Sequence, residues 1–407
     1  MIIEQNRYLS SKENSVQGRY VIQEQIEEFL KKKASRFEVR TEGASVQNRS
    51  IKSITFGKGD KKILMWSQMH GNESTTTKAV LDLINYLDLE LEFEPAEQTD
   101  LDRQKGSGTG KILIPQLGAS KSKDLISLEA TTVLENCRIT IIPMLNPDGA
   151  AAYTRVNANE VDLNRDAADR TQPESVILRE VFNRFQPDFC FNLHDQRTIF
   201  NVGDTAKPAT VSFLAPAYDA ERSVSPSRLE SMQLIAAMNH QLQTKISGQV
   251  GRYDDAFNPN CVGDAFQMTD TPTVLFEAGH HPEDYQRERT REYIFYALTT
   301  ALQAIGENAH FRFNESDYLQ IPENQKRFLD VIIENAHVLN PTLEIGTAIG
   351  VLYKEVLDND RILFNPKIEK TGDLKGYFGH QIYNCMISND LDAVKRHPAL
   401  FELLSKS

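Results

Sequence analysis

The chain has 407 residues, of which 40% are hydrophobic, and it has a formal net charge of −12 at pH 7. This length exceeds the usual size of one domain, so we expect one large domain and one smaller domain. The acidic balance and the lack of a basic stripe argue against binding to nucleic acid or to an anionic membrane surface. We therefore expect no nucleic-acid partner and no membrane partner, and no pattern in the sequence sets an oligomeric state.

The sequence shows no segment typical of export or membrane insertion. Residues 1–5 contain no basic region followed by a long apolar run, and no run of about 18 apolar residues occurs. The cysteines Cys137, Cys190, Cys261 and Cys385 are far apart and lack metal-type spacing, so we interpret them as thiols rather than disulfides. No inhibitory N-terminal segment is evident. These features predict a cytoplasmic protein that is made in its active form.

Strand-like and helix-like segments alternate along most of the chain, which is typical of an α/β architecture. Residues 21–33 have apolar side chains at helical spacing, and residues 51–55 alternate like a half-buried strand. The continuous apolar run 63–66 predicts an interior strand, and residues 75–87 predict a helix with one apolar face. An acidic and then Gly/Ser-rich segment between residues 93 and 110 predicts an exposed loop.

Polar groups typical of enzyme sites follow several predicted strands. Further apolar runs predict strands at residues 139–145, 189–193, 211–215 and 273–276. Three of these runs end in Asn146-Pro147-Asp148-Gly149, His194-Asp195 and Glu277-Ala278-Gly279, and His70 follows the earlier run 63–66. Ligands of open α/β sheets bind where the carboxyl ends of the strands meet. The sequence therefore predicts a site at this edge of a sheet.

Two histidines and a glutamate have the spacing of a catalytic zinc site. His70 and Glu73 are separated by two residues, and His194 lies 121 positions after Glu73 (194 − 73). Zinc binds imidazole nitrogen and carboxylate oxygen, and a hydrolytic site uses three protein ligands so that a fourth position can hold water. The pair supplies two ligands from one turn, and His194 completes the site when the chain folds. We expect one zinc ion per chain.

The remaining histidines are not expected to bind the metal. His280 and His281 follow Glu277, but catalytic zinc needs only the three ligands already assigned, so we interpret both as loop residues. The others lack acidic or histidine partners at ligand spacing: His240, His310, His337, His380 and His397.

Five short motifs follow one another between about residues 60 and 300. They are His70-x-x-Glu73, Asn146-Pro147-Asp148-Gly149, Arg155-Val156-Asn157 leading into Val161-Asp162-Leu163-Asn164-Arg165, Asn192-Leu193-His194, and Phe276-Glu277. Each motif alone is weak, but five in this order resemble the zinc carboxypeptidase family, the carboxypeptidase A-like metallopeptidases. The resemblance implies an α/β fold with a mixed, mostly parallel central sheet flanked by helices, in a catalytic domain of residues 1–306.

The resemblance also implies roles for the residues around the metal. His70, Glu73 and His194 would hold the zinc ion, whose open position would activate a water molecule. Glu277 would act as the general base on that water and would pass the proton to the leaving amine. Arg155 would stabilise the negative charge that develops on the substrate's carbonyl oxygen.

Further roles follow from the same resemblance. Asn164 and Arg165 resemble the pair that binds the substrate's C-terminal carboxylate, a task that suits the planar fork of guanidinium. Asp162 would accept a hydrogen bond from the non-coordinating nitrogen of His70 and fix its tautomer. Tyr253 resembles a tyrosine on a mobile loop that hydrogen-bonds the bound peptide, although its local spacing differs. Purely structural roles for Asp162 and Tyr253 stay open.

Two departures from the family pattern concern specificity. Ser74 follows Glu73, where tryptophan is common, and Asp166-Ala167-Ala168-Asp169 follows the Asn-Arg pair, where an aromatic residue is common. Neither change removes a catalytic group. The surroundings of the carboxylate anchor are unusually acidic, which leaves room for a cationic substrate or for one that is not an ordinary peptide.

The chain changes character beyond residue 306. Short β-rich runs at residues 345–353 and 362–366 are separated by turn residues, which predicts a small β-rich domain over residues 307–407. Similar appendages occur in the N-acyl amino acid deacylases of the aspartoacylase and succinylglutamate desuccinylase group. Those enzymes share a His-x-x-Glu motif and a Leu-Asn-Arg segment.

Three functions are therefore open. The first is a zinc metallocarboxypeptidase that hydrolyses the C-terminal peptide bond of peptides through a metal-activated water, and the Asn146–Gly149 motif favours it. The second is a zinc-dependent deacylase of N-acyl amino acids. The third is a catalytically silent binding module, which the intact base and ligands oppose. The expected partner is a peptide or a small amino-acid-derived substrate.

Overall fold

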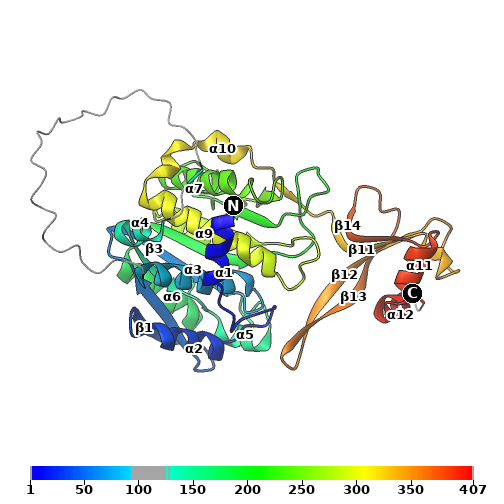
Figure 1. Ribbon diagram of the computed structural model, residues 1–407, viewed down its shortest axis with the longest axis horizontal. Helices are drawn as coiled ribbons and strands as arrows, with labels where there is room; N and C mark the ends of the chain where they lie inside the picture. Colours follow the sequence, from blue (N-terminus) through cyan, green and yellow to red (C-terminus); the bar gives the residue numbers. More distant parts are fainter. Residues whose placement is uncertain (1, 93–124, 127–128, 406–407) are drawn as a thin grey trace, which may run out of the picture.

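The computed structural model describes residues 2–92, 125–126 and 129–405 (Figure 1). Within these residues an eight-stranded sheet flanked by helices forms the larger part, and a four-stranded sheet forms the C-terminal part. The expected α/β fold with a β-rich C-terminal region is confirmed. The expected loop between residues 93 and 110 lies outside the described residues. No helix among the described residues is both long enough and apolar enough to span a membrane.

The larger sheet is mixed, with a parallel centre. In the order in which they lie side by side, its strands are β1 (Glu38–Ala44), β2 (Ser50–Phe56), β4 (Cys137–Ile142), β3 (Lys61–Ser67), β5 (Phe189–Asp195), β9 (Thr273–Ala278), β7 (Val211–Leu214) and β8 (Val250–Arg252). Strands β4, β3, β5 and β9 are parallel, whereas β2 and β7 run antiparallel to them. The carboxyl ends of β3, β5 and β9 therefore meet at one edge.

Strand β3 shows why this sheet is buried on both faces. Ile63 and Met65 belong to one apolar cluster, and Leu64 and Trp66 belong to a second, because successive side chains of a strand point to opposite faces. The first cluster includes residues of α1 (Ile2–Ser11), α2 (Gln23–Lys33), α3 (Thr75–Glu92), α4 (Ala130–Asn136), α7 (Pro226–Leu242) and α9 (Glu288–Gly306). The second includes residues of α6 (Pro173–Phe185) and α8 (Val262–Gln267).

Helices α3 and α9 enclose an ion pair in the core. The Asp82 and Arg291 side chains are fully buried, with Arg291 Nε 2.6 Å from Asp82 Oδ2 and Nη2 2.5 Å from Oδ1. Arg291 also donates to the carbonyl oxygens of Glu13 and Val16, so it ties the N-terminal segment to this face. Arg291 also contacts the partly exposed Glu288 at 3.2 Å, but Asp82 is its only fully buried counter-charge among the described residues.

We expect Asp82→Ala to lower the free energy of unfolding by about 3–5 kcal/mol, because the buried Arg291 guanidinium loses both of its hydrogen bonds to Asp82 and keeps only the single ion-pair contact with Glu288 at 3.2 Å. Urea unfolding followed by circular dichroism measures this change. Glu28→Ala is the control, since it removes an exposed ion pair with Lys32 on α2, and we expect it to leave the transition unchanged. A small effect of Asp82→Ala would show that this pair does not stabilise the packing of α3 on α9.

The segment after α9 packs on the larger part. It contains the 3₁₀ turn η2 (Ala309–Arg312) and α10 (Glu315–Leu319), and Phe313, Tyr318 and Ile321 belong to the first apolar cluster. Strand β10 (Asn324–Gln325) then pairs with β6 (Asn201–Val202). The domain division expected between residues 306 and 307 stays a prediction, but in the structure residues 309–325 pack with the larger part.

The C-terminal sheet has the order β13 (Arg361–Gly372), β12 (Ala348–Asp358), β11 (Phe328–Glu334) and β14 (Phe378–Asn384). Strands β12 and β13 form a long hairpin whose two-residue turn has Asn359 at φ 52°, a conformation that asparagine tolerates well. The 3₁₀ turn η3 (Ala336–Val338) follows β11, and α11 (Ser388–Lys395) and α12 (Pro398–Ser405) bury one face of the sheet. The hairpin extends beside the larger part, on the side of α5 (Pro147–Ala152) (Figure 1).

Candidate active site

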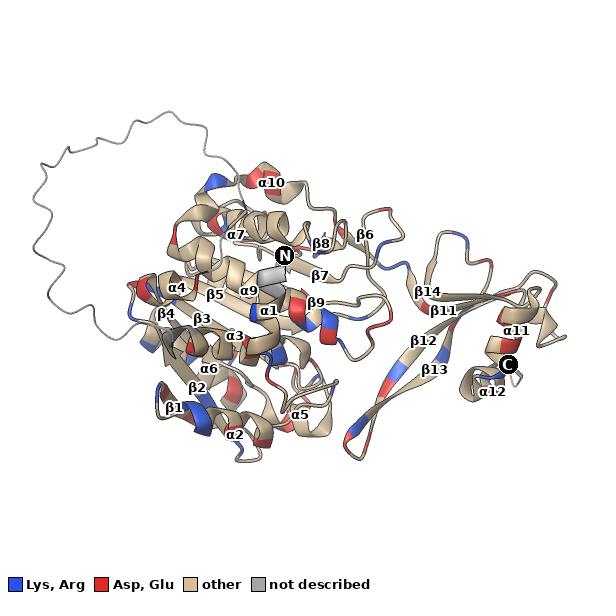
Figure 2. Ribbon diagram, in the orientation of Figure 1, with Lys and Arg blue, Asp and Glu red and all other residues tan. Residues whose placement is uncertain are grey.

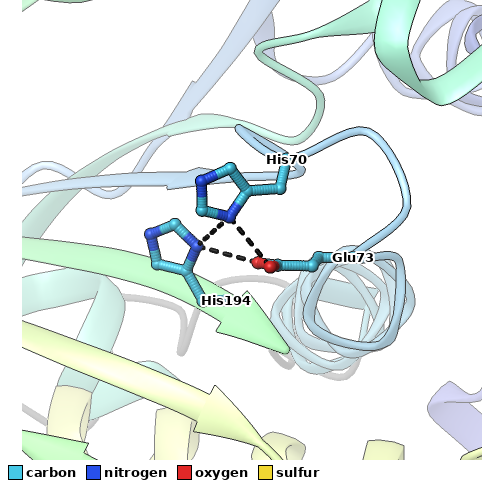
Figure 3. A group of neighbouring side chains, drawn as sticks. All are labelled: His70, Glu73 and His194. Atoms are coloured by element: carbon cyan, nitrogen blue, oxygen red, sulfur yellow. Dashed lines mark hydrogen bonds and ion pairs between the residues drawn. The ribbon is translucent and has the colours of Figure 1, made fainter. Parts of the chain in front are cut away.

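Three side chains from separate parts of the chain converge at the edge of the larger sheet (Figure 3). His70 and Glu73 lie between β3 and α3, and His194 lies near the end of β5. His70 Nδ1 is 2.8 Å from Glu73 Oε1, and His194 Nδ1 is 2.8 Å from Glu73 Oε2. The two Nδ1 atoms are 3.1 Å apart. The structure thus brings together the three residues that the sequence predicts as metal ligands.

The hydrogen bonding of His70 shows that this group suits a cation. His70 Nε2 lies 2.9 Å from Asp162 Oδ1, and because a carboxylate accepts, the neutral ring has its proton on Nε2. His70 Nδ1 then presents a lone pair to the Glu73 carboxylate, which also presents only lone pairs. A positive charge between them resolves this conflict. Two imidazole nitrogens and one carboxylate form a ligand set of catalytic zinc, so the residues present fit that ion.

The electrostatics of the group point the same way. Burial disfavours a charged His70, but the Glu73 and Asp162 carboxylates outweigh burial and raise its pKa. Burial also opposes the charge of Glu73, yet the two histidines hold the pKa of this carboxyl well below its usual range. The site therefore attracts positive charge, and protons compete with a metal ion for the same nitrogen atoms.

Close backbone packing fixes the turn between the first two ligands. A side chain at Gly71 would place its Cβ 1.9 Å from the carbonyl carbon of Gly149, so only glycine fits in His70-Gly71-Asn72-Glu73. The backbone N–H of Asp195 donates to Glu73 Oε2 at 3.1 Å, which aligns this carboxylate with the end of β5. The turn is therefore held against both α5 and β5.

The Asn146-Pro147-Asp148-Gly149 motif supports this turn from behind. Asn146 accepts a hydrogen bond from the Gly149 backbone N–H at 2.8 Å, which caps α5, and donates to the Met69 carbonyl oxygen at 3.1 Å. Asp148 accepts from the Ser45 hydroxyl at 2.8 Å and so ties α5 to the loop between β1 and β2. The motif positions the residue before His70.

Asp162 links His70 to Arg155. Arg155 Nε donates to Asp162 Oδ2 at 3.0 Å, and Arg155 Nη1 donates to Glu73 Oε1 at 3.2 Å. The Arg155 side chain is 49% exposed, so a fixed guanidinium beside the metal group remains open to a substrate. Burial raises the pKa of Asp162, but His70 and Arg155 outweigh burial and hold it well below its usual range.

We expect Asp162→Ala to weaken zinc binding about 10–100-fold, because the His70 ring loses the hydrogen bond that sets its tautomer. Competition with a chromogenic chelator measures the zinc affinity directly, without reference to catalysis. Asp169→Ala removes an exposed carboxylate nearby and should leave the affinity unchanged. Equal affinities of the wild type and Asp162→Ala would exclude this orienting role.

Glu277 lies beside His194 on the neighbouring strand. The two residues are in register between the parallel strands β9 and β5, so their side chains lie on the same face of the sheet. Glu277 is buried, and its Oε2 has no hydrogen-bond partner among the described residues. Burial, followed by the negative charge of Glu73, raises the pKa of Glu277 well above its usual value. A raised pKa is typical of carboxyl groups that accept and return protons in catalysis.

The 3₁₀ turn η1 (Leu163–Arg165) contains the predicted carboxylate anchor. Asn164 Oδ1 accepts from the Val262 backbone N–H at 3.1 Å, which fixes the turn against α8. Arg165 Nη1 donates to the Asn164 carbonyl oxygen at 2.7 Å and lies 3.0 Å from Cys261 Sγ. The Arg165 side chain is exposed, so it remains accessible.

Tyr253 follows β8 and lies near the site. Its ring packs against Phe200 with the ring centroids 5.3 Å apart. Burial raises the pKa of Tyr253, and the negative charges of Glu277 and Glu73 raise it further. The structure therefore places this tyrosine within electrostatic reach of both glutamates.

His280 lies apart from the three metal-binding candidates, in the loop that follows β9. Its ring is buried, with ring centroids 4.2 Å from His380 on β14 and 4.7 Å from Tyr285. His380 in turn stacks on Phe328. These rings join the two sheets, a role that neither histidine's sequence position indicates.

The C-terminal sheet forms part of the site, which the sequence did not indicate. A cavity of about 450 Å³ lies next to Glu73 and Arg155, and residues of β12 and β13 line its other side. The hairpin contains both charged and apolar residues, as expected of any strands with one solvated face. No local signal in the sequence distinguishes a solvated face from one that faces a cavity.

Comparison with known proteins agrees with the resemblance. Residues 22–98 match the sequence model of the zinc carboxypeptidase family. A probable carboxypeptidase 2 from Arthroderma benhamiae is 32% identical over 79 residues, which cover 19% of this chain and 14% of that protein. Carboxypeptidase SOL1 from Arabidopsis thaliana is 50% identical over 44 residues, which cover 11% of this chain and 9% of that protein. The match thus spans a small fraction of these curated relatives.

Solved carboxypeptidase structures also align with this chain. Carboxypeptidase A from Helicoverpa armigera aligns over 76% of this chain and 80% of its own, with 16% identity and a TM-score of 0.49. A metallo-carboxypeptidase from Pseudomonas aeruginosa, solved with (2-guanidinoethylmercapto)succinic acid, aligns over 70% of this chain and 69% of its own, with 16% identity and a TM-score of 0.46. Residues 22–98 thus match the sequence model of the zinc carboxypeptidase family, and His194 folds against the two ligand candidates that lie inside that match.

Proposed function

We propose that this protein is a zinc-dependent metallocarboxypeptidase that hydrolyses the C-terminal peptide bond of peptides. The main support is the buried group of His70, Glu73 and His194, with Glu277 in register beside His194 and its Oε2 atom without a hydrogen-bond partner among the described residues. Zinc bound there would polarise the substrate carbonyl and lower the pKa of the attacking water. The family match does not favour the alternative, a deacylase of N-acyl amino acids.

In this proposal Glu277 moves the proton. Its Oε2 accepts the proton of the attacking water and then returns it to the amine that leaves. Burial favours this role because the protonated form of Glu277 is more stable here than in water. Arg155, held by Asp162, donates to the carbonyl oxygen as negative charge develops on it.

Asn164 and Arg165 would select a free C-terminus. The Asn164 Oδ1 is occupied by Val262, whereas its amide nitrogen donates to no residue that the structure describes. Together with the exposed Arg165 guanidinium, this amide can bind a carboxylate through several hydrogen bonds. Tyr253 would close on the bound peptide from the β8 side.

A peptide library with mass-spectrometric detection tests the activity. We expect the zinc-loaded protein to release single C-terminal residues, the chelator-treated protein to release none, and C-terminal amidation of the peptides to suppress the reaction. Amidation removes the carboxylate that Asn164 and Arg165 would bind. Cleavage at internal bonds, or equal rates on free and amidated peptides, would rule out a carboxypeptidase.

We also propose that the protein acts in the cytoplasm. Cys137, Cys190, Cys261 and Cys385 are all free in the structure, which is typical of reducing compartments. Fractionation of cells that express the tagged chain tests this location, and recovery of the protein in a secreted or membrane fraction would contradict it.

A further inference from the structure

The cavity beside the metal group is built from both sheets. Glu73 and Arg155 belong to its lining on the side of the larger sheet, and Tyr353, Lys354, Glu355 and Lys367 belong to its lining on the hairpin β12–β13. Asn164 and Arg165 are not among the lining residues. If those two hold the C-terminal carboxylate, the cavity receives the part of the substrate on the amino side of the scissile bond.

Two sets of contacts hold the hairpin against the larger part. Glu355 on β12 forms an ion pair with the buried Arg19 at 3.0 Å and accepts a hydrogen bond from the Tyr153 hydroxyl. Farther along the cavity, the Tyr285 ring packs on Tyr353 and Phe364, with ring centroids 5.4 Å away in each case. The hairpin is therefore a fixed wall. The resulting volume of about 450 Å³ suits a small ligand rather than an extended polypeptide.

The Tyr285 hydroxyl also helps to hold the hairpin, through a hydrogen bond to Asp330. It donates to Asp330 Oδ1 at 3.0 Å, and the Tyr353 backbone N–H donates to Asp330 Oδ2 at 2.7 Å. Asp330 is buried, and both of its oxygen atoms accept these bonds. This carboxylate is therefore engaged in holding the wall and is not free to bind a substrate cation.

The charges that remain free in the cavity are mostly positive. Glu355 is paired with Arg19, and Asp195 accepts from the backbone N–H groups of Thr75 and Thr76. The lining also contains three exposed cations, Arg197, Lys354 and Lys367, and one exposed carboxylate, Glu369. None of these four side chains forms an ion pair with another residue that the structure describes. Figure 2 shows that charged residues of both signs lie along the hairpin. Free cations thus outnumber free anions where the substrate would extend.

We propose that the hairpin β12–β13 makes this enzyme selective for short peptides with an acidic side chain on the amino side of the scissile bond. The inference rests on the proposed carboxypeptidase activity. The wall would limit the length of chain that the cavity holds, and Lys354 and Lys367 of the hairpin line this cavity together with Arg155 and Arg197 of the larger part. A carboxylate between these groups gains charge-assisted hydrogen bonds that an amide cannot match.

Peptides that differ in one side chain test the charge preference. Tripeptides with Glu, Gln or Lys before the cleaved residue are compared by kcat/KM at low salt. We expect the wild type to prefer Glu over Gln by about tenfold and to disfavour Lys further. In Lys354→Gln/Lys367→Gln the preference of Glu over Gln should fall to about twofold or less, while kcat/KM for the Gln peptide stays unchanged.

The control and a length series complete the test. Arg361 lies on β13, as Lys367 does, but it does not line the cavity. We therefore expect Arg361→Gln to keep the wild-type preference of Glu over Gln. Extension of the Glu peptide by five glycines at its amino end should lower kcat/KM at least about tenfold, because the wall excludes the longer chain. Zinc content and the thermal unfolding temperature of each variant show whether it has folded.

The outcomes distinguish the two proposals. Equal kcat/KM values for the Glu and Gln peptides, an unchanged preference in the double variant, or equal rates on short and extended peptides would overturn the inference and leave the carboxypeptidase proposal in place. Failure of the zinc-loaded protein to release a C-terminal residue from any peptide would overturn the proposed function, and the inference with it.

Discussion

Glu277→Gln should lower kcat about 10²–10⁴-fold while the protein keeps its zinc. Glutamine has nearly the same shape as glutamate but cannot accept the proton of the attacking water. Glu277 is not one of the three residues that converge as metal ligands, so we expect metal binding to survive. Initial rates on a peptide that the wild type cleaves, together with elemental analysis of the same sample, measure both quantities.

The matched control for this variant is Glu283→Gln. Glu283 is an exposed glutamate six positions farther along the chain (283 − 277), and its replacement should leave kcat and zinc content unchanged. Wild-type activity of Glu277→Gln would show that another group accepts the proton. Loss of zinc from Glu277→Gln would instead indicate that Glu277 is a metal ligand.

His194→Ala should abolish stoichiometric zinc binding and, with it, peptide hydrolysis. His194 is the ligand candidate that joins β5 to the turn after β3, so without it His70 and Glu73 offer only two ligands. Binding to the folded state also stabilises it, by about 4 kcal/mol at a free zinc concentration 1,000 times the dissociation constant. We therefore expect zinc to raise the thermal unfolding temperature of the wild type and not that of His194→Ala.

His281→Ala is the control for the metal ligand. His281 follows β9 and its Nδ1 lies 3.1 Å from the Pro282 carbonyl oxygen, away from the three ligand candidates. This variant should bind zinc and unfold like the wild type. Stoichiometric zinc in His194→Ala, or its loss in His281→Ala, would mean that the metal site has been assigned to the wrong residues.

Local patterns in the sequence predicted the elements that build the centre of the molecule. The apolar runs at residues 63–66 and 189–193 lie within strands β3 and β5 because interior strands need apolar side chains on both faces. The helix expected over residues 75–87 is α3, which extends to Glu92. These predictions succeed because hydrophobic periodicity is a property of residues that are close together in the sequence.

The gathering of the metal ligands could be predicted only in part. The two-residue gap between His70 and Glu73 is a local feature, and the position of His194 at a strand end suggested the same edge of the sheet. Their distances, and the link from His70 through Asp162 to Arg155, depend on how β3, β5 and η1 pack. A sequence pattern contains no information about such separations.

The sequence by itself therefore determined the alternation of strands and helices and the chemical types available for a zinc site. Tertiary structure alone decided that Asp82 is buried against Arg291 and that the hairpin β12–β13 lines the cavity beside Glu73. An aspartate on a helix and a lysine on a strand normally indicate solvated faces. Whether water or another part of the chain meets such a face depends on residues that are distant in the sequence, and folding alone brings them together.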